Sequence, residues 1–188
     1  NSSSNSCKSI KITDMTVKKL ITVPDEILRK SSLPIEKISN NEKKLIKDLF
    51  ETMYHHKGIG LAAIQMGIPK RIIVLDVSQK DEIKKPLCFI NPVVKNVSEE
   101  KSKYEEGCLS IPITFIEIER PKTCLVEYID IEGKKKSMEC DDLLSTCIQH
   151  EINHLDGKLI IDFLSKLKKD LIIKKLSKTK QNADRIVV

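Results

Sequence analysis

The stretch Gln149-His150-Glu151-Ile152-Asn153-His154 decides the fold of this chain, because it predicts the helix around which the rest is built. It holds two of the four histidines, four residues apart, with a glutamate directly after the first. On a helix this spacing stacks both imidazoles on one face, one turn apart. Two neutral imidazoles can then bind one divalent metal ion, and the glutamate can accept a proton from an activated water. The stretch predicts metal-assisted hydrolysis, with a solvated helix as the alternative.

The residues around this stretch give the helix a start, an apolar side and an end. Asp141 or Asp142 can cap its first turn, and Gly157 suits the left-handed conformation that ends many helices. Apolar residues recur at helical spacing, namely Leu143, Leu144, Cys147, Ile148 and Ile152. We therefore expect a buried helix that ends at Gly157.

A catalytic metal site with two histidines needs a third protein ligand and an open position for water. No glutamate follows Glu151 and no histidine follows His154. The aspartates that remain downstream have no recognisable setting. We therefore expect the third ligand to come from upstream, where a cysteine thiolate is a suitable donor.

The six cysteines form no CxxC pair, so they do not indicate a zinc ribbon, and a chain of this length needs no disulfide framework. Three lie in strand-like apolar segments and are expected to be buried: Cys88, Cys124 and Cys140. Cys147 lies one turn before His150, where it can be a fourth ligand or line an open site. Cys108 stands in Glu106-Gly107-Cys108-Leu109-Ser110, where the glycine permits close backbone approach, although a turn before a strand is the alternative.

A third unusual stretch reads Gly58-Ile59-Gly60-Leu61-Ala62-Ala63-Ile64-Gln65. Its two glycines and small residues predict a tight turn into a closely packed segment. It lacks the third glycine and the lysine of a phosphate-binding loop, which excludes a nucleotide site of that kind. Gln65 is polar within an apolar run. It can be a hydrogen-bonded core amide or an amide donor to a developing oxyanion.

In this order, the three stretches resemble the peptide deformylase family, whose motifs are GxGLAAxQ, EGCLS and QHExxHxxG. They correspond to Gly58–Gln65, Glu106–Ser110 and Gln149–Gly157, and the resemblance covers about residues 20–178. It implies a metal-dependent hydrolase that removes the formyl group from the N-terminal formyl-methionine of newly made polypeptides and releases formate. A metallopeptidase and a non-catalytic structural metal-binding protein are the alternatives.

The resemblance also assigns roles to individual residues. Cys108, His150 and His154 would bind one metal ion per chain, natively Fe²⁺, which Zn²⁺, Co²⁺ or Ni²⁺ can replace. Glu151 would act as general base and then as general acid. The side chain of Gln65 and the backbone N–H of Leu109 would form the oxyanion hole.

Substrate contacts follow from the same resemblance. The backbones of Ile59, Gly60 and Gly107 would bind the peptide as an added strand. The pocket for the methionine side chain would be formed by Tyr104, Leu143, Thr146, Cys147 and His150. Glu106 and Arg120 match a structural ion pair that supports the metal-binding loop.

Two positions depart from the family pattern. Asn153 stands where an aspartate is usual, which alters the hydrogen bonds around the metal ligands. Phe115 stands where bacterial members often have a polar or basic residue, which alters contacts to later residues of the substrate.

The chain as a whole predicts an α+β fold, in which antiparallel sheets surround the central metal-binding helix and a C-terminal helix follows. Ser39 and Glu42 form a capping box for a helix that runs to about His56, and its buried side holds Leu45, Ile46, Leu49 and Met53. Strands are expected at Arg71–Val77, Leu87–Val97, Phe115–Arg120, Thr123–Ile131 and Lys135–Glu139, with a turn at Asp130–Gly133. We expect an N-terminal extension of residues 1–19, a catalytic domain of residues 20–178 and a tail of residues 179–188.

The formal net charge of +6 is concentrated in residues 164–188, which carry eight basic and two acidic side chains. Leu167, Leu171, Ile172 and Leu176 recur there at helical spacing and predict an amphipathic helix packed on the core. The alternative is an element that faces ribosomal RNA, as a C-terminal helix does in bacterial members. No run of apolar residues is long enough to span a membrane.

Formylated initiation is a feature of bacteria and of organelles derived from them. The chain is rich in lysine, isoleucine and asparagine, and its serine- and lysine-bearing N-terminal segment has no methionine start. These features favour a mature organellar form, of a plastid or apicoplast, with a bacterial cytoplasmic enzyme as the alternative.

Overall fold

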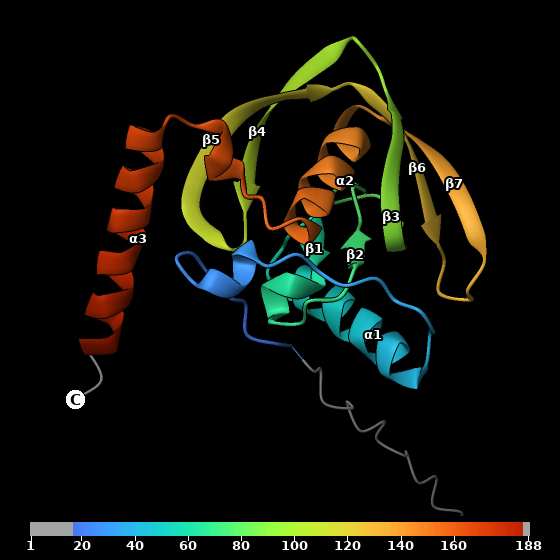
Figure 1. The fold of residues 1–188 in the computed structure, drawn as a ribbon, viewed down its shortest axis with the longest axis horizontal. Coiled ribbons are helices and arrows are strands. Elements are labelled where there is room, and N and C mark those ends of the chain that lie inside the picture. The colour runs from blue at the N-terminus through green and yellow to red at the C-terminus, as the bar shows by residue number, and fades with distance from the viewer. Residues whose placement is uncertain (1–16, 186–188) are drawn as a thin grey trace, which may run out of the picture.

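The structure, a computed structural model, describes residues 17–185 and the side chains of residues 17–180 (Figure 1). The strands are β1 (Gly60–Ala62), β2 (Ile72–Leu75), β3 (Leu87–Val97), β4 (Lys101–Cys108), β5 (Ile111–Pro121), β6 (Thr123–Ile129) and β7 (Lys135–Asp141). The α-helices are α1 (Asn40–His55), α2 (Asp142–Leu155) and α3 (Lys166–Arg185). Short 3-10 helices are η1 (Glu26–Arg29), η2 (Ala63–Met66) and η3 (Ile160–Phe163).

The strands form two antiparallel sheets on either side of α2. Five strands pair in the order β1-β2-β3-β6-β7, and β4 pairs with β5 in a separate ribbon. In Figure 1, α2 lies between the β4–β5 ribbon and strands β3, β6 and β7. The expected α+β fold, with sheets around a central helix and a helix at the C-terminal end, is confirmed.

Strand β2 is buried on both faces because a helix covers each of them. Ile72 and Val74 point to the cluster that contains the apolar side of α1. Ile73 and Leu75 point to the cluster that contains Ile148 of α2. Alternate side chains of a strand point to opposite faces, so four consecutive apolar residues are what a two-sided strand requires.

Helix α1 follows its sequence prediction closely. Ser39 is the N-cap and forms a capping box with Glu42. The four apolar residues expected on the inner side, Leu45, Ile46, Leu49 and Met53, are buried. The helix ends at His55, one residue before the expected end.

The expected cap of α2 is wrong at its start and confirmed at its end. Asp141 occupies the N-cap, but its side chain makes no capping hydrogen bond. Asp142 is the first helical residue, has a φ of 48°, and donates its N–H to the carbonyl of Lys122 at 3.0 Å. Gly157 has a φ of 71°, in the left-handed region, as the sequence predicts.

Strand β4 was not predicted as a strand. Its sequence, from Lys101 to Cys108, is mostly polar and lacks a clear apolar alternation. It becomes a strand through pairing with β5, which begins at Ile111 and is therefore longer than the expected Phe115–Arg120. Pairing with the strand that follows it, rather than an apolar pattern of its own, determines β4.

Helix α3 packs on the molecule with only part of its apolar surface. Ile172, Ile173 and Leu176 pack against a cluster that includes Val23 and Ile118. The expectation that Leu167 and Leu171 would also pack is wrong, since they are 71% and 58% exposed. None of the described helices combines the length and apolar content needed to cross a membrane. The expected N-terminal extension lies mostly in residues 1–16, outside the described part of the chain.

Candidate metal centre and adjoining pocket

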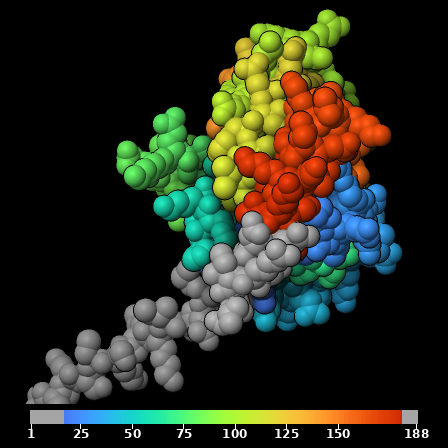
Figure 2. All heavy atoms as spheres, turned by 90° about the vertical axis from the view of Figure 1, so that its left-hand side faces the viewer, coloured from blue at the N-terminus to red at the C-terminus, as the bar shows by residue number. Residues whose placement is uncertain are grey.

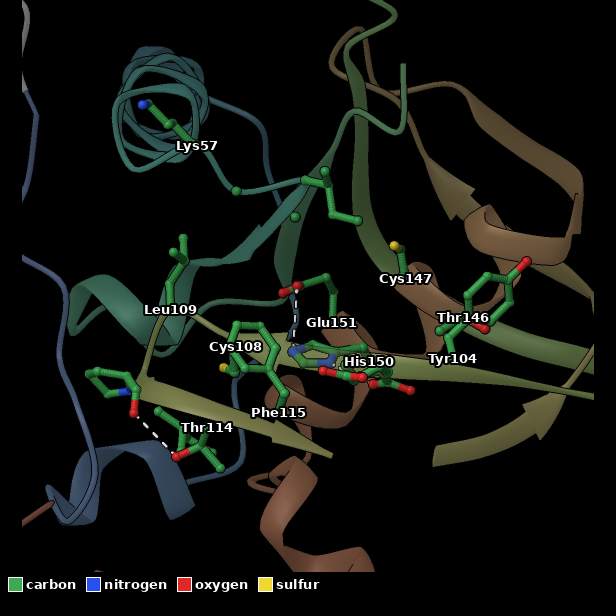
Figure 3. Close-up of a pocket in the computed structure, with 18 of the residues that line it drawn as sticks. Lys57, Tyr104, Cys108, Leu109, Thr114, Phe115, Thr146, Cys147, His150 and Glu151 are labelled. Carbon is green, nitrogen blue, oxygen red and sulfur yellow. Dashed lines mark hydrogen bonds and ion pairs between the residues drawn. The ribbon is translucent and has the colours of Figure 1, made fainter. Parts of the chain in front are cut away.

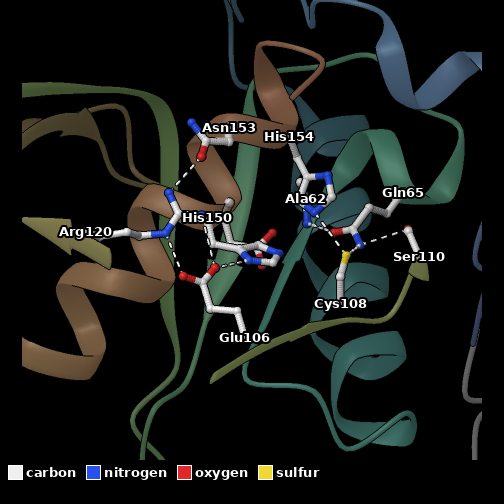
Figure 4. A network of polar contacts seen from close by, with 10 residues as sticks. Ala62, Gln65, Glu106, Cys108, Ser110, Arg120, His150, Asn153 and His154 are labelled. Atoms are coloured by element: carbon white, nitrogen blue, oxygen red, sulfur yellow. Dashed lines mark hydrogen bonds and ion pairs between the residues drawn. The ribbon is translucent and has the colours of Figure 1, made fainter. Parts of the chain in front are cut away.

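Three side chains converge beside α2 as a candidate metal centre (Figure 4). Cys108, His150 and His154 each offer one ligand atom, and these atoms all lie within 4.8 Å of one another. The Sγ atom of Cys108 lies 3.4 Å from Nε2 of His154. Both histidines are buried and Cys108 is half-buried, so the three donors are largely shielded from water.

Local geometry explains the convergence. The four-residue spacing brings the two imidazoles to a centroid separation of 5.0 Å on one side of α2. Cys108 is the last residue of β4, and the β4–β5 register shifts between Gly107 and Cys108. Such an irregularity re-aims a side chain, here toward the helix. A helix and the end of a strand, 42 residues apart in sequence, thus supply one set of donors.

A chain of buried hydrogen bonds orients His150. Nδ1 of His150 lies 2.9 Å from Oε1 of Glu106. Arg120 donates to both oxygens of Glu106 at 2.7 and 3.0 Å, and its remaining nitrogen Nη1 donates to Oδ1 of Asn153 at 2.8 Å. The Glu106–Arg120 ion pair expected from the sequence is therefore present. Because Glu106 occupies Nδ1, Nε2 of His150 is left to face the other donors.

The carboxylate of Glu151 is buried next to these donors. Its Oε1 lies 3.9 Å from Nε2 of His150, and within the described chain its Oε2 has no hydrogen-bond partner. Gly60 gives it room, since a Cβ there would lie 2.7 Å from Oε1 of Glu151. Burial raises the pKa of Glu151 to about 7, a value suited to accepting and donating protons near neutral pH.

Gln65 is held as a polar group inside the core, as one of its two interpretations predicts. Its Oε1 accepts the N–H of Ala62 at 2.9 Å. Its Nε2 donates to Oγ of Ser110 at 3.0 Å and lies 3.7 Å from Sγ of Cys108. The amide is therefore fixed with its nitrogen toward the candidate centre, where it can also serve as a donor.

A pocket of about 540 Å³ opens onto this centre (Figure 3). All the residues expected to contact substrate line it, namely Ile59, Gly60, Gly107, Tyr104, Leu143, Thr146 and Cys147. Cys108, Leu109, His150 and Glu151 line it as well, whereas His154 is buried and is not among the lining residues. In Figure 3, Tyr104, Thr146 and Cys147 lie on one side of His150, and Leu109 and Thr114 lie on the other.

Sequence reasoning missed several residues of the site. Ser110 holds the amide of Gln65, and Lys57, Ile113 and Thr114 line the pocket. Lys57 and Ile113 have positive φ values of 57° and 58°. Non-glycine residues in that region give no signal in sequence, so only the folded backbone reveals them.

The donor set fits a divalent transition metal, because two imidazoles and one thiolate suit iron, zinc, cobalt and nickel. Burial, together with the charges of His150 and Arg120, lowers the pKa of His154 and favours the neutral imidazole that a metal requires. Burial acts in the same direction on His150, but hydrogen bonds to Cys108 and Glu106 outweigh it and raise that pKa to about 10. A metal ion therefore competes with a proton for His150. Cys147 is not part of the three-donor group and lies on the pocket wall.

Comparison with known proteins gives a consistent result. The model of the family described as polypeptide deformylase matches residues 17–170. A peptide deformylase of Pelagibacter ubique is 56% identical over 93% of this chain and 100% of its own, and one of Rhizobium meliloti is 55% identical over 87% and 94%. The crystal structure of peptide deformylase from Ehrlichia chaffeensis is 41% identical, with a TM-score of 0.84 over 90% of this chain and 99% of its own.

Proposed function

The chain belongs to the polypeptide deformylase family, and we propose that Cys108, His150 and His154 bind the metal ion of its reaction. The enzyme hydrolyses the amide between a formyl group and the N-terminal methionine of a newly made polypeptide. The observation that supports the ligand assignment is the convergence of three donor atoms within 4.8 Å beside the pocket.

Glu151 is the proposed proton carrier. Cys108, His150 and His154 would hold a divalent ion, which would supply Lewis acidity for a carbonyl and for water near neutral pH. The carboxylate of Glu151 accepts the proton of the attacking water. It then donates that proton to the amine nitrogen as the bond between the formyl carbon and nitrogen breaks. Two observations support this role: Oε2 has no hydrogen-bond partner among the described residues, and Oε1 lies 3.9 Å from Nε2 of His150.

Gln65 and the backbone N–H of Leu109 are the proposed donors to the oxyanion. The amide nitrogen of Gln65 has two hydrogens, of which one is used by Ser110. The other is directed toward Cys108, where Nε2 of Gln65 lies 3.7 Å from Sγ, a weak contact that a developing oxyanion can replace. Donors that are fixed before the reaction lower its barrier because they need no reorganisation.

Two strands at sheet edges are the proposed binding surface for the substrate backbone. Strand β1 is the first strand of its sheet, and β4 belongs to a ribbon of only two strands. Ile59, Gly60 and Gly107 lie along these edges and line the pocket. An extended peptide can pair with such edges, while its methionine side chain enters the space lined by Tyr104, Leu143, Thr146 and Cys147.

Fe²⁺ is the proposed native ion, with Zn²⁺, Co²⁺ or Ni²⁺ as substitutes. Two imidazoles and a thiolate support either iron or zinc. Measuring the bound metal after anaerobic purification from cells supplied with iron tests this proposal. Zinc as the only ion in such a preparation would contradict it.

Release of formate from formyl-Met-Ala-Ser tests the function itself. The metal-loaded protein is expected to release one formate per peptide, and acetyl-Met-Ala-Ser serves as the matched control. The metal-free protein and Cys108→Ala are expected to lose the activity. A metallopeptidase would instead cut an internal peptide bond, and a purely structural metal site would bind the ion without turnover.

We further propose a bacterial cytoplasmic setting, because the curated relatives of high identity are bacterial enzymes. The organellar expectation has no support from these relatives. Ribosome binding through α3 also stays a proposal. Lys174 and Lys178 on its exposed side are suited to phosphate contacts, and cosedimentation with ribosomes should then fall steeply with salt.

A further inference from the structure

A second groove lies directly beside the pocket, between α3 and the start of β5. Its volume is about 470 Å³. The two hollows share the segment of residues 112–115, which forms a wall of each. Figure 2 shows the face on which α3, in red, lies beside the yellow β5 region. The groove thus adjoins the pocket, with the segment of residues 112–115 between them.

The groove combines an apolar wall with basic residues. Ile113 is 90% exposed and Phe115 is 68% exposed, although both are large apolar side chains. On the side of α3, half-buried Ile172 and Leu176 line the groove. Exposed apolar side chains gathered at a groove are typical of a binding surface.

Two lysines of α3 give the groove its charge. Lys175 and Lys180 line it and are exposed. No acidic residue is among its described lining residues. A ligand that fits this surface therefore carries apolar side chains together with negative charge.

We propose that this groove binds the downstream segment of the same polypeptide whose formylated N-terminus lies in the pocket, with a preference for apolar and acidic side chains. The inference rests on the proposed function, because it takes the pocket as the site of the formyl-methionine. It extends the substrate from its first residues to a longer segment of chain.

The arrangement of the residues around the pocket supports the downstream polypeptide segment as the occupant of the groove. Tyr104 and Cys147, proposed for the methionine side chain, lie on one side of His150, and Thr114 lies on the other (Figure 3). A chain that leaves toward Thr114 reaches the wall shared with the groove. An extended peptide advances about 3.3 Å per residue, so a peptide of twelve residues spans about 40 Å and a tripeptide only about 10 Å. An RNA strand would use the lysines but gain little from Ile113 and Ile172.

The test compares short and long substrates at an ionic strength near 0.15 M, where exposed charges are screened over about 8 Å. The short substrate is formyl-Met-Ala-Ser. The long ones are formylated dodecapeptides that begin Met-Ala-Ser and continue with leucine alternating with glutamate, lysine or serine. For wild type, kcat/KM should be highest for the glutamate peptide and lowest for the lysine peptide.

Charge reversal in the groove has a matched control on the same helix. Lys175→Glu and Lys180→Glu should lower kcat/KM for the glutamate dodecapeptide about fivefold and raise it for the lysine dodecapeptide. Lys174→Glu and Lys178→Glu, outside the groove lining, should change neither by more than about twofold. All four variants should process formyl-Met-Ala-Ser at the wild-type rate.

A steric variant tests the apolar wall separately. Thr179 lines the groove and is exposed, so Thr179→Trp fills the groove without disturbing the core. It should lower kcat/KM for the serine dodecapeptide several-fold and leave the tripeptide unchanged.

The possible failures are distinguishable. No formate from formyl-Met-Ala-Ser with the wild-type protein would show that the proposed function is wrong. Normal turnover of the tripeptide with no effect of Lys175→Glu, Lys180→Glu or Thr179→Trp on long peptides would overturn the groove inference alone. It would also be overturned if the lysine variants changed only ribosome binding.

Discussion

The free carboxylate oxygen of Glu151 leads to the first prediction at the scale of single residues. Glu151→Gln keeps the size of the side chain but cannot accept a proton. Turnover of formyl-Met-Ala-Ser should fall by about 10²- to 10⁴-fold, the usual contribution of general acid–base catalysis. Metal content, measured by elemental analysis, should stay at one ion per chain. A variant that retains a tenth or more of wild-type kcat would contradict the assigned role.

Asn153 is predicted to help position the metal ligand His150 by way of Arg120 and Glu106. It accepts a hydrogen bond from Arg120, which is 4% exposed and also holds Glu106 against His150. Asn153→Ala leaves one buried N–H donor of the guanidinium without this acceptor. Metal affinity should fall about tenfold or more, as is usual when partners of metal ligands are removed.

Competition with a chromophoric chelator, starting from the metal-free protein, measures this effect without reference to catalysis. Asn153→Asp supplies an acceptor at the same place and should keep most of the affinity. Equal metal affinity in wild type and Asn153→Ala would show that Arg120 holds Glu106 without help from Asn153.

At the residue scale, the sequence predicted which side chains form the candidate metal centre. It did not predict all the hydrogen bonds that orient the neighbouring side chains. The motifs predicted that Cys108, His150 and His154 would meet, and the structure brings them together. The support of Gln65 by Ser110 was not predicted. It depends on a turn between two long strands, which no local pattern specifies.

At the scale of elements, the end of α2 yields a stability prediction with an internal control. Gly157 has a φ of 71°, and a Cβ there would overlap the backbone carbonyl oxygen of Arg29. Gly133 has a similar φ of 85°, but no atom lies within 4 Å of its Cβ position. The two glycines therefore separate the cost of backbone conformation from the cost of close contact.

Gly133→Ala should lower the free energy of unfolding by about 1 kcal/mol, the usual cost of the left-handed conformation for other residues. Gly157→Ala should cost about 2 to 4 kcal/mol, because η1 must also move away from the helix. Denaturant unfolding followed by circular dichroism measures both. Similar losses for the two variants would refute the role of the Arg29 contact.

Elements with a clear sequence signal of their own were predicted, whereas β4, which has none, was not. Helix α1 has a capping box and an apolar side, and β3 was predicted with its exact limits. Strand β4 has neither feature and forms only because β5 lies beside it. The exposure of Leu167 and Leu171 was also not predicted. Helical spacing shows which residues share one side of a helix, but not how much of that side packs against the rest of the protein.

At the scale of the whole molecule, one carboxylate connects the N-terminal η1 to the C-terminal elements η3 and α3. Asp162 in η3 accepts a hydrogen bond from Nη1 of Arg29 in η1 at 2.6 Å. It accepts another from Nζ of Lys169 in α3, also at 2.6 Å. It also accepts the N–H of Leu159 at 2.9 Å. Helix α3 has few buried apolar residues, so this ionic contact contributes a relatively large part of its attachment.

These contacts predict how stability changes in acid. Burial alone would raise the pKa of Asp162, but hydrogen bonds from Arg29, Lys169 and Leu159 lower it from 3.8 to about 2. Because the folded-state pKa lies below the unfolded one, the stabilisation is complete above about pH 4 and is lost as the pH falls toward 2. The shift corresponds to at most about 2.5 kcal/mol, and partial exposure reduces this to about 1 kcal/mol.

Asp162→Asn should therefore destabilise the protein by about 1 kcal/mol at pH 6 and by much less at pH 2, where the wild-type carboxyl is itself about half protonated. Urea unfolding of the metal-free proteins at both pH values measures the difference, since acid would otherwise also release the metal. Asp170→Asn, at an exposed position of α3, is the matched control and should show little difference between the two pH values. A loss that is equal at pH 6 and pH 2 would mean that Asp162 acts through shape or neutral hydrogen bonds. If the free energy of unfolding is lowered only at pH 6, the negative charge of Asp162 is what stabilises the packing of α3 and η1 on the rest of the enzyme.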